Sequence, residues 1–161
     1  MEQYNNVFYF ANINSIGGVE SFFYYLAKKY SDLADITVFY RNGQLPQIRR
    51  LQQLVQVKKF NNQKIKCKKL FINYTHDIID YVEANEYIEV IHGDLKALNK
   101  IPHLHPKITK YIGVSQLVCD SFKELTGKDI ELCYNPIDLD TPPKVLKLVS
   151  ATRLTEEKRK R

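Results

Sequence analysis

Short apolar runs with strand character alternate along this chain with segments whose apolar residues recur at the helical period. The first run, Val7 to Ala11, is followed by the glycines Gly17 and Gly18, and a helical pattern begins at Val19. Strands that alternate with helices are typical of a parallel sheet, because parallel neighbours need long crossover connections. The sequence therefore predicts a Rossmann-like α/β domain, with a parallel sheet and helices on both faces.

The remaining segments continue this alternation. Ser115 is expected to cap the last helix of the series, and Gly127 is expected to end it, because glycine readily adopts the left-handed conformation found after helices. We expect strands at 35–40, 55–57, 64–67, 70–74, 87–91, 110–114 and 130–134, and helices at 45–54, 77–85 and 116–125.

The composition changes after Asp138. Thr141-Pro142-Pro143 can continue neither a helix nor a strand, and Val145 to Ser150 is a new apolar run of strand type. We expect residues 1–141 to form an N-terminal domain. Residues 142–161 are expected to be a linker and the first strand of a second, truncated domain.

Charge and cysteine content limit the possible classes of protein. The net charge is +6, but removing the four charges of Lys158 to Arg161 leaves only +2, so the charge gives little support for nucleic-acid binding. Cys67, Cys119 and Cys133 form no CxxC pair, which favours a reducing compartment. Met1 to Asn6 carry no basic region, and no apolar stretch is long enough to span a bilayer. We expect a cytoplasmic protein.

Gly17 and Gly18 lie between the first strand and the first helix. The free N–H groups at a helix start attract phosphate, and glycine allows a ligand to approach the backbone. The alternative is a tight turn that needs no ligand. The GxGxxG pattern of dinucleotide-binding proteins is missing, and Tyr40-Arg41 stands where an acidic residue should meet a ribose. A nicotinamide enzyme is therefore not expected.

Two further groups of polar residues follow predicted strands. His92-Gly93-Asp94 lies just past a buried strand, at the edge of an open parallel sheet where ligands bind. The imidazole of His92 could form a hydrogen bond with a sugar hydroxyl, or His92 could have a structural role. Arg153 and Lys158 follow the last predicted strand and could hold a diphosphate, or they could belong to a solvated basic terminus.

Two weaker patterns leave other roles open. His103 and His105 could chelate a metal, but no cysteine or acidic residue stands at ligand spacing, so no metal site is predicted. The segment Lys58–Lys69 carries six lysines and no acidic residue and could contact anionic lipid. However, residues 64–68 alternate lysine with apolar residues, which favours an edge strand protected against aggregation.

The order of these segments resembles that of family 4 glycosyltransferases, which have the GT-B fold. Ile16 to Glu20 resembles the glycine-rich loop before the first helix of that family. Tyr111 to Ser115 and Glu131 to Asp138 resemble the "VS … NPID" ending of its N-terminal domain. Leu148 to Lys158 resembles the "GRL…EKG" opening of its donor-binding domain.

The resemblance implies two Rossmann-like domains that face each other across a cleft. It also implies hexosyl transfer from a nucleotide-sugar, which is a substrate, with retention at the anomeric carbon and without a metal or another cofactor. Gly17 and Gly18 would lie near the donor phosphates, and His92 near the transferred sugar. Arg153 and Lys158 would neutralise the leaving diphosphate.

The resemblance covers the acceptor-side half of such an enzyme. Arg159 stands where the family usually has glycine, and the paired glutamates that hold the donor are not in this sequence. The chain alone is therefore expected to be inactive and to need a donor-binding half. The expected acceptor is a glycan or glycolipid of polysaccharide biosynthesis, reached in the cytoplasm or at the inner face of the membrane. The alternatives are a non-catalytic glycan-binding module and one half of a split transferase. Apolar surface left bare by the absent half is expected to favour self-association.

Overall fold

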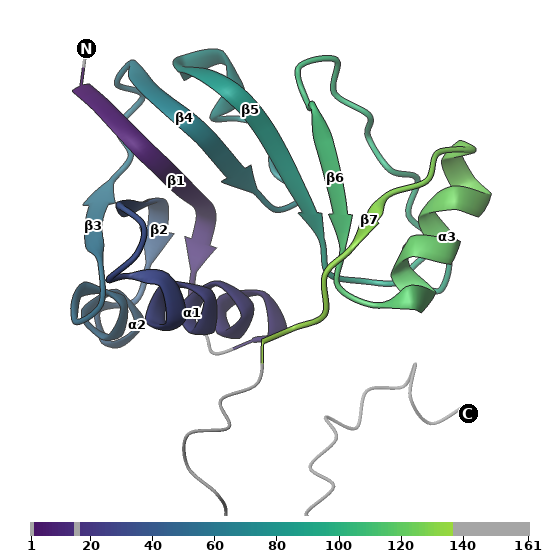
Figure 1. The fold of residues 1–161 in the computed structure, drawn as a ribbon, viewed down its shortest axis with the longest axis horizontal. Helices are drawn as coiled ribbons and strands as arrows, with labels where there is room; N and C mark the ends of the chain where they lie inside the picture. Colours follow the sequence, from purple (N-terminus) through teal and green to yellow (C-terminus); the bar gives the residue numbers. More distant parts are fainter. Residues whose placement is uncertain (1, 15–16, 137–161) are drawn as a thin grey trace, which may run out of the picture.

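The computed structural model of the protein describes residues 2–14 and 17–136 (Figure 1). Within them the chain forms an all-parallel sheet together with α-helices and one 3₁₀ turn, which confirms the predicted α/β class. The strands are β1 (Glu2–Ile13), β2 (Ile36–Gly43), β3 (Gln56–Lys59), β4 (Ile65–Ile72), β5 (Val82–Ile91), β6 (Lys110–Gly113) and β7 (Glu131–Leu132). The helical elements are α1 (Gly18–Tyr30), α2 (Leu45–Gln52), α3 (Gln116–Thr126) and the 3₁₀ turn η1 (Ile79–Tyr81).

The strand order is β3-β2-β1-β4-β5-β6-β7. The chain runs outward from β1 to β3 on one side and then crosses back to place β4 on the other side of β1. Val7 in β1 is therefore level with Thr37 of β2 and with Leu70 of β4. The direction of the strand order therefore reverses between β1 and β4, and ligands bind beside the carboxyl ends of the strands at such a reversal in open sheets of this kind.

Helices cover both faces of the sheet, as predicted. On one face, Phe23 of α1 packs against Phe8 of β1 with ring centres 5.0 Å apart, and α2 lies beside α1 (Figure 1). Ile112 of β6 lines a hollow on this same face. Its neighbour Tyr111 points to the opposite face, because side chains alternate along a strand. There Phe122 of α3 stacks on Tyr111 at 5.2 Å.

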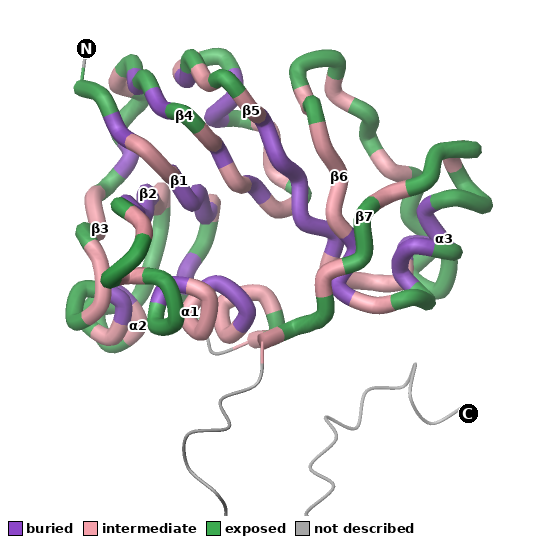
Figure 2. The backbone as a smooth tube through the Cα atoms, viewed as in Figure 1, coloured by how far each residue is buried: buried purple, intermediate pink, exposed green. Residues whose placement is uncertain are grey.

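Loops complete the core on the face that α3 covers. Phe60, from the crossover between β3 and β4, packs edge-on against Tyr9 of β1 at 5.6 Å. Ile78 and Ile79, which precede β5, are fully enclosed. Burial of each such side chain contributes about 1.5–3 kcal/mol. Figure 2 shows buried residues running along the second half of β5, in the middle of the sheet.

The predicted ends of α3 are confirmed. The hydroxyl of Ser115 accepts a hydrogen bond from the N–H of Val118 at 3.3 Å. Gly127 has φ = 72°, and its N–H donates to the carbonyl of Lys123 at 2.8 Å. A side-chain oxygen at the start and a left-handed glycine at the end satisfy backbone groups that the helix itself leaves unpaired.

Two predictions for the middle of the chain are wrong. Residues 64–67 and 70–74 do not form two strands, because β4 runs through both without a break. Residues 77–85 do not form a helix, since η1 is only one turn and β5 begins at Val82. The pairing of β4 skips Lys68, and its buried residues fall at 65, 67, 70 and 72. The alternation therefore changes phase inside one strand, which makes it look like two.

The prediction that residues 64–68 form an edge strand is also wrong. β4 lies between β1 and β5, and the edge strands of the described sheet are β3 and β7. Two lysines of β4 form ion pairs with β5, Lys66 with Glu83 at 2.8 Å and Lys69 with Glu86 at 3.2 Å. The alternation reflects one buried and one solvated face, which interior strands also have.

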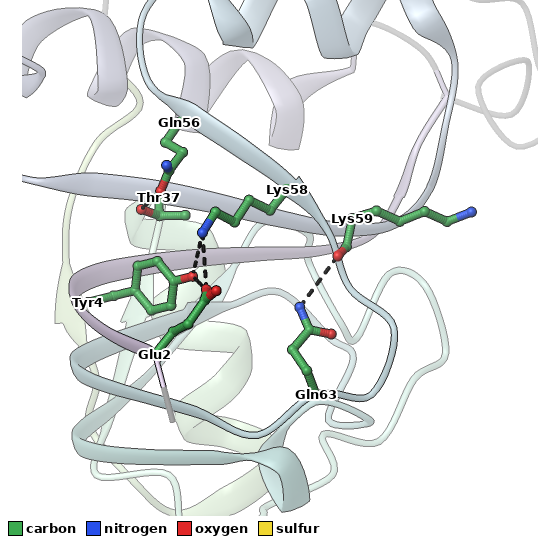
Figure 3. Close-up of polar contacts among 7 residues, drawn as sticks. All are labelled: Glu2, Tyr4, Thr37, Gln56, Lys58, Lys59 and Gln63. Carbon is green, nitrogen blue, oxygen red and sulfur yellow. Dashed lines mark hydrogen bonds and ion pairs between the residues drawn. The ribbon is translucent and has the colours of Figure 1, made fainter.

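Lys58, on the edge strand β3, is held by the start of β1. Its ammonium group lies 3.0 Å from the Glu2 carboxylate and donates to the Tyr4 hydroxyl at 2.8 Å (Figure 3). The side chain of Lys59 points away from this group (Figure 3). Three of the six lysines in the segment 58–69 are therefore paired with carboxylates. The membrane contact suggested for this segment stays a prediction.

Candidate functional site

The carboxyl edge of the sheet brings together the glycine-rich turn after β1 and the histidine after β5. α1 begins at Gly18, and His92 directly follows β5. The His92 ring lies edge-on to Phe22 of α1, with ring centres 5.2 Å apart, and 5.8 Å from Phe23. Phe22 and His92, which are 70 positions apart in the sequence, thus meet at this edge of the sheet.

The start of α1 is capped by a side chain of the same helix. The N–H of Gly17 donates to Oε2 of Glu20 at 3.1 Å, and a Cβ on Gly17 would lie 2.7 Å from that oxygen. The Glu20 carboxylate, at the end of a flexible side chain, would have to shift to admit that Cβ. A Cβ on Gly18, in contrast, would meet no atom of the described residues within 4 Å. Gly18 is the position where another molecule has room to approach the helix start.

The surroundings of the His92 ring favour the neutral form of its imidazole. Its Nε2 atom is buried and has no hydrogen-bond partner within the described part of the chain. Burial among the aromatic rings of α1 lowers the pKa of His92 to about 4, because a charged imidazolium is poorly solvated there. At neutral pH the side chain can exchange hydrogen bonds with a neutral hydroxyl, but it supplies no positive charge.

Tyr74 fixes the backbone beside His92. Its hydroxyl accepts hydrogen bonds from two successive N–H groups, those of His92 at 2.8 Å and Gly93 at 2.6 Å. Tyr74 adopts φ = 53°, a left-handed conformation that is rare for a bulky residue and that often marks a functional site. A Cβ on Gly93 would lie 3.3 Å from this hydroxyl and 3.0 Å from Leu98. A side chain at position 93 would therefore push these neighbours by a few tenths of an ångström.

Asp94, the third residue of the predicted group, starts the turn that follows. Its Oδ1 accepts a hydrogen bond from the N–H of Ala97 at 3.1 Å, and its carbonyl accepts one from Leu98 at 3.0 Å. These contacts are those of a turn-forming aspartate. Sequence reasoning missed Tyr74, although it follows β4 and must lie at the same sheet edge as His92.

A pocket of 260 Å³ lies on the face of the sheet that α3 covers. Its walls include the stacked rings of Tyr111 and Phe122, together with Tyr74. Glu89 of β5 also lines the pocket although the residue is only 4% exposed. Burial raises the pKa of Glu89, and a hydrogen bond and the charge of His76 act in the opposite direction. A buried carboxylate beside a pocket is a feature of many functional sites.

Glu89 belongs to a chain of polar contacts that sequence reasoning missed. Its Oε2 lies 2.9 Å from Nε2 of His76, and Nδ1 of His76 lies 3.1 Å from Nδ1 of His103. The ring of His105 is 5.3 Å from that of His76. The sequence shows His103 and His105 as a pair, but His76 comes from a segment 27 residues earlier, and the fold brings it to them.

A second hollow, of 240 Å³, lies between α1 and the face of the sheet formed by β1 and β4 to β6. Phe8, Phe71, Val90 and Ile112 line it, so its surface is largely apolar. Among the described residues this hollow is apolar surface of the kind that would favour self-association, but self-association itself stays a prediction.

The other predicted site residues cannot be placed. Arg153 and Lys158, the strand expected at 145–150 and the domain boundary near residue 141 all lie outside the described residues. No α-helix in the described ranges combines the length and the apolar character needed to cross a membrane. Comparison with protein-family models, with curated proteins and with solved structures gives no significant match for this chain.

Proposed function

We propose that this chain is the acceptor-side half of a retaining glycosyltransferase of the GT-B type, similar to family 4. Such an enzyme would transfer a hexose from a nucleotide-sugar to a glycan or glycolipid. The observation that carries the proposal is the contact between His92 and Phe22 of the glycine-started helix α1 at the carboxyl edge of the sheet. This is the place where an open parallel sheet binds ligands, and the resemblance assigns both motifs to the donor site.

The chemistry of these residues suits a sugar better than a free phosphate. Neutral His92 can accept or donate one hydrogen bond, which matches a sugar hydroxyl. Gly18 leaves space at the positive end of the α1 dipole, where part of a diphosphate would be stabilised. Most of the positive charge needed for the leaving diphosphate would come from Arg153 and Lys158 and from a donor-binding half.

The test is a donor-turnover experiment with mass-spectrometric detection. UDP-, GDP- and ADP-sugars would be incubated with this chain alone and with a version that continues into a donor-binding half. We expect turnover only from the longer protein, with the anomeric configuration of the sugar retained in the product. A longer protein that turns over no donor, or a product with inverted configuration, would contradict the proposal. If there is no turnover but the chain binds glycans, the non-catalytic module is the better interpretation.

The residue-level test compares His92→Gln with the longer wild-type protein. Gln keeps a hydrogen-bonding side chain but changes its shape, so kcat/KM should fall by at least about tenfold, which corresponds to roughly 1.4 kcal/mol of transition-state stabilisation. The matched control is Lys66→Gln, which changes an exposed residue of β4 whose ion pair lies away from this edge. Equal activity of the two variants would show that His92 has no role in transfer.

A further inference from the structure

Three of the four histidines in this chain gather at one place on the surface of the domain. The ring centres of His76 and His103 are 5.2 Å apart, those of His76 and His105 are 5.3 Å apart, and those of His103 and His105 are 6.5 Å apart. His76 follows β4, whereas the other two belong to the segment between β5 and β6. The cluster therefore joins two separate connections of the fold.

A buried carboxylate sets the orientation of the central histidine. Oε2 of Glu89 lies 2.9 Å from Nε2 of His76, so the Nε2–H of His76 donates to the carboxylate. This bond leaves the lone pair of His76 on Nδ1, the atom that lies 3.1 Å from Nδ1 of His103. Histidines that bind metals almost always donate their other N–H group to a carboxylate, a carbonyl or a water in this way.

The ring spacings match those of imidazoles around one metal ion. With Zn–N bonds of about 2.0–2.1 Å and tetrahedral angles, ring centres would lie about 5.2 Å apart and ligand nitrogens about 3.4 Å apart. Two of the three ring spacings agree with this value within 0.1 Å. In the present conformation no three metal-binding groups of the described residues converge on one point. The ring spacing that exceeds this value is the one between His103 and His105, at 6.5 Å. Binding of one ion by all three rings therefore requires His105 to shift inward.

We propose that His76, His103 and His105 bind a divalent ion of the zinc class, with Glu89 as the carboxylate that orients His76. Nδ1 of His105 accepts the N–H of Lys107 at 3.2 Å, so Nε2 is the atom that His105 offers to the ion. An all-imidazole set suits Zn²⁺, Co²⁺, Ni²⁺ or Cu²⁺, whereas Mg²⁺ and Ca²⁺ prefer oxygen ligands. This proposal does not depend on the proposed transferase function.

Charged side chains around the three histidines determine the electrostatic environment of the ion. Glu89 supplies one negative charge on the protein side of the cluster, and Lys100 lines the same pocket. Asp80 acts on His105 from the other side and pairs with Lys107 at 3.7 Å. The fourth ligand position would open toward the pocket and be taken by water. The ion would fasten the segment between β5 and β6 to the connection after β4.

The first experiment is a titration of the untagged protein with Zn²⁺ by calorimetry and with Co²⁺ by visible absorption. We expect one ion per chain and the intense absorption that is typical of tetrahedral Co²⁺. His103→Ala and His105→Ala should each weaken binding by at least about 100-fold, because each removes a ligand. His103 is exposed, so its substitution removes no core packing, and circular dichroism would verify the fold.

Matched controls separate this site from other ligands in the chain. His92→Phe removes the fourth histidine, and Cys133→Ser removes the most accessible cysteine; both should leave the affinity unchanged. Glu89→Gln should weaken binding about 10–100-fold while all three histidines remain, as expected for a residue that orients a ligand. Unchanged Zn²⁺ affinity in the double variant His103→Ala/His105→Ala would overturn the proposal, and so would the weak absorption of octahedral Co²⁺.

Discussion

The burial of His92 predicts an acid-sensitive contribution to stability. The side chain has a pKa of about 4 in the folded protein and an ordinary value of 6.5 when the chain unfolds. Below pH 6.5 the unfolded chain takes up a proton that the folded protein resists. The free energy of unfolding must therefore fall as the pH decreases from 6.5 toward 4.

The size of the effect follows from the two pKa values. At pH 5 the protonation of His92 in the unfolded chain lowers the free energy of unfolding by about 2 kcal/mol, whereas at pH 7.5 it lowers this free energy by almost nothing. This is an upper limit, since the ring is not completely enclosed and solvent screens part of the cost. Replacement of His92 by Phe should remove the effect, because a phenyl ring packs between Phe22 and Phe23 without taking up a proton. At pH 7.5 it should also remove the unpartnered Nε2 atom, so we expect little loss of stability.

Urea unfolding followed by circular dichroism at pH 7.5 and pH 5.0 measures both quantities. The drop in the free energy of unfolding between these pH values should be smaller in His92→Phe than in the wild-type protein, by up to about 2 kcal/mol. His103→Gln is the matched control, because the His103 ring is exposed, and it should change the drop far less. Equal drops in the wild-type protein and in His92→Phe would refute the reasoning.

Two further predictions test packing near β6 and at the cysteines. Gly113→Ala should destabilise the protein by about 1–3 kcal/mol in urea unfolding, because the new Cβ would lie 2.6 Å from Sγ of Cys119. When the same change is made in a Cys119→Ala protein, it should cost clearly less than in the wild-type protein. Equal costs in the two backgrounds would contradict this explanation. Burial raises the pKa of the Cys67 thiol to about 12 and also raises the pKa of Cys119. Iodoacetamide at pH 8 should therefore modify Cys133 first, which peptide mass spectrometry would show. Modification of Cys67 at a similar rate would mean that its surroundings are open to solvent.

The parts of the fold that the sequence predicts well are those with local signals. The period of the apolar residues predicted α1, and the hydroxyl of Ser115 and the glycine at 127 correctly predicted α3 and its ends. The failures lie where the strand pattern is irregular. The buried side chains of β4 and β5 change phase at the level of Lys68 and Asn85, where the ladder lacks a pair although the register stays the same, so no window across them shows regular alternation. The helix predicted over 77–85 ran across this irregular stretch.

The candidate site residues also differ in whether a local sequence signal predicts them. His92 was predicted because a polar group directly follows a buried strand, and that signal is local. Tyr74 and His76 were missed because their roles depend on which strand lies next to β5, and the sequence does not show that β4 and β5 pair. Glu89 was missed because it stands inside an apolar strand, where only a partner such as His76 explains a carboxylate.

The hydrogen bonds at the carboxyl edge of the sheet limit what the described residues can offer to a ligand. The N–H of Gly17 is bonded to Glu20, and those of His92 and Gly93 are bonded to Tyr74. A ligand that bonds these groups must displace an existing partner, so each exchange gains little. Nε2 of His92 has no partner to displace among the described residues, but it is buried, so a ligand reaches it only if the side chain moves. A neutral hydroxyl group would satisfy this atom, and if the proposed transferase function holds, the charge that binds a diphosphate has to come from other residues.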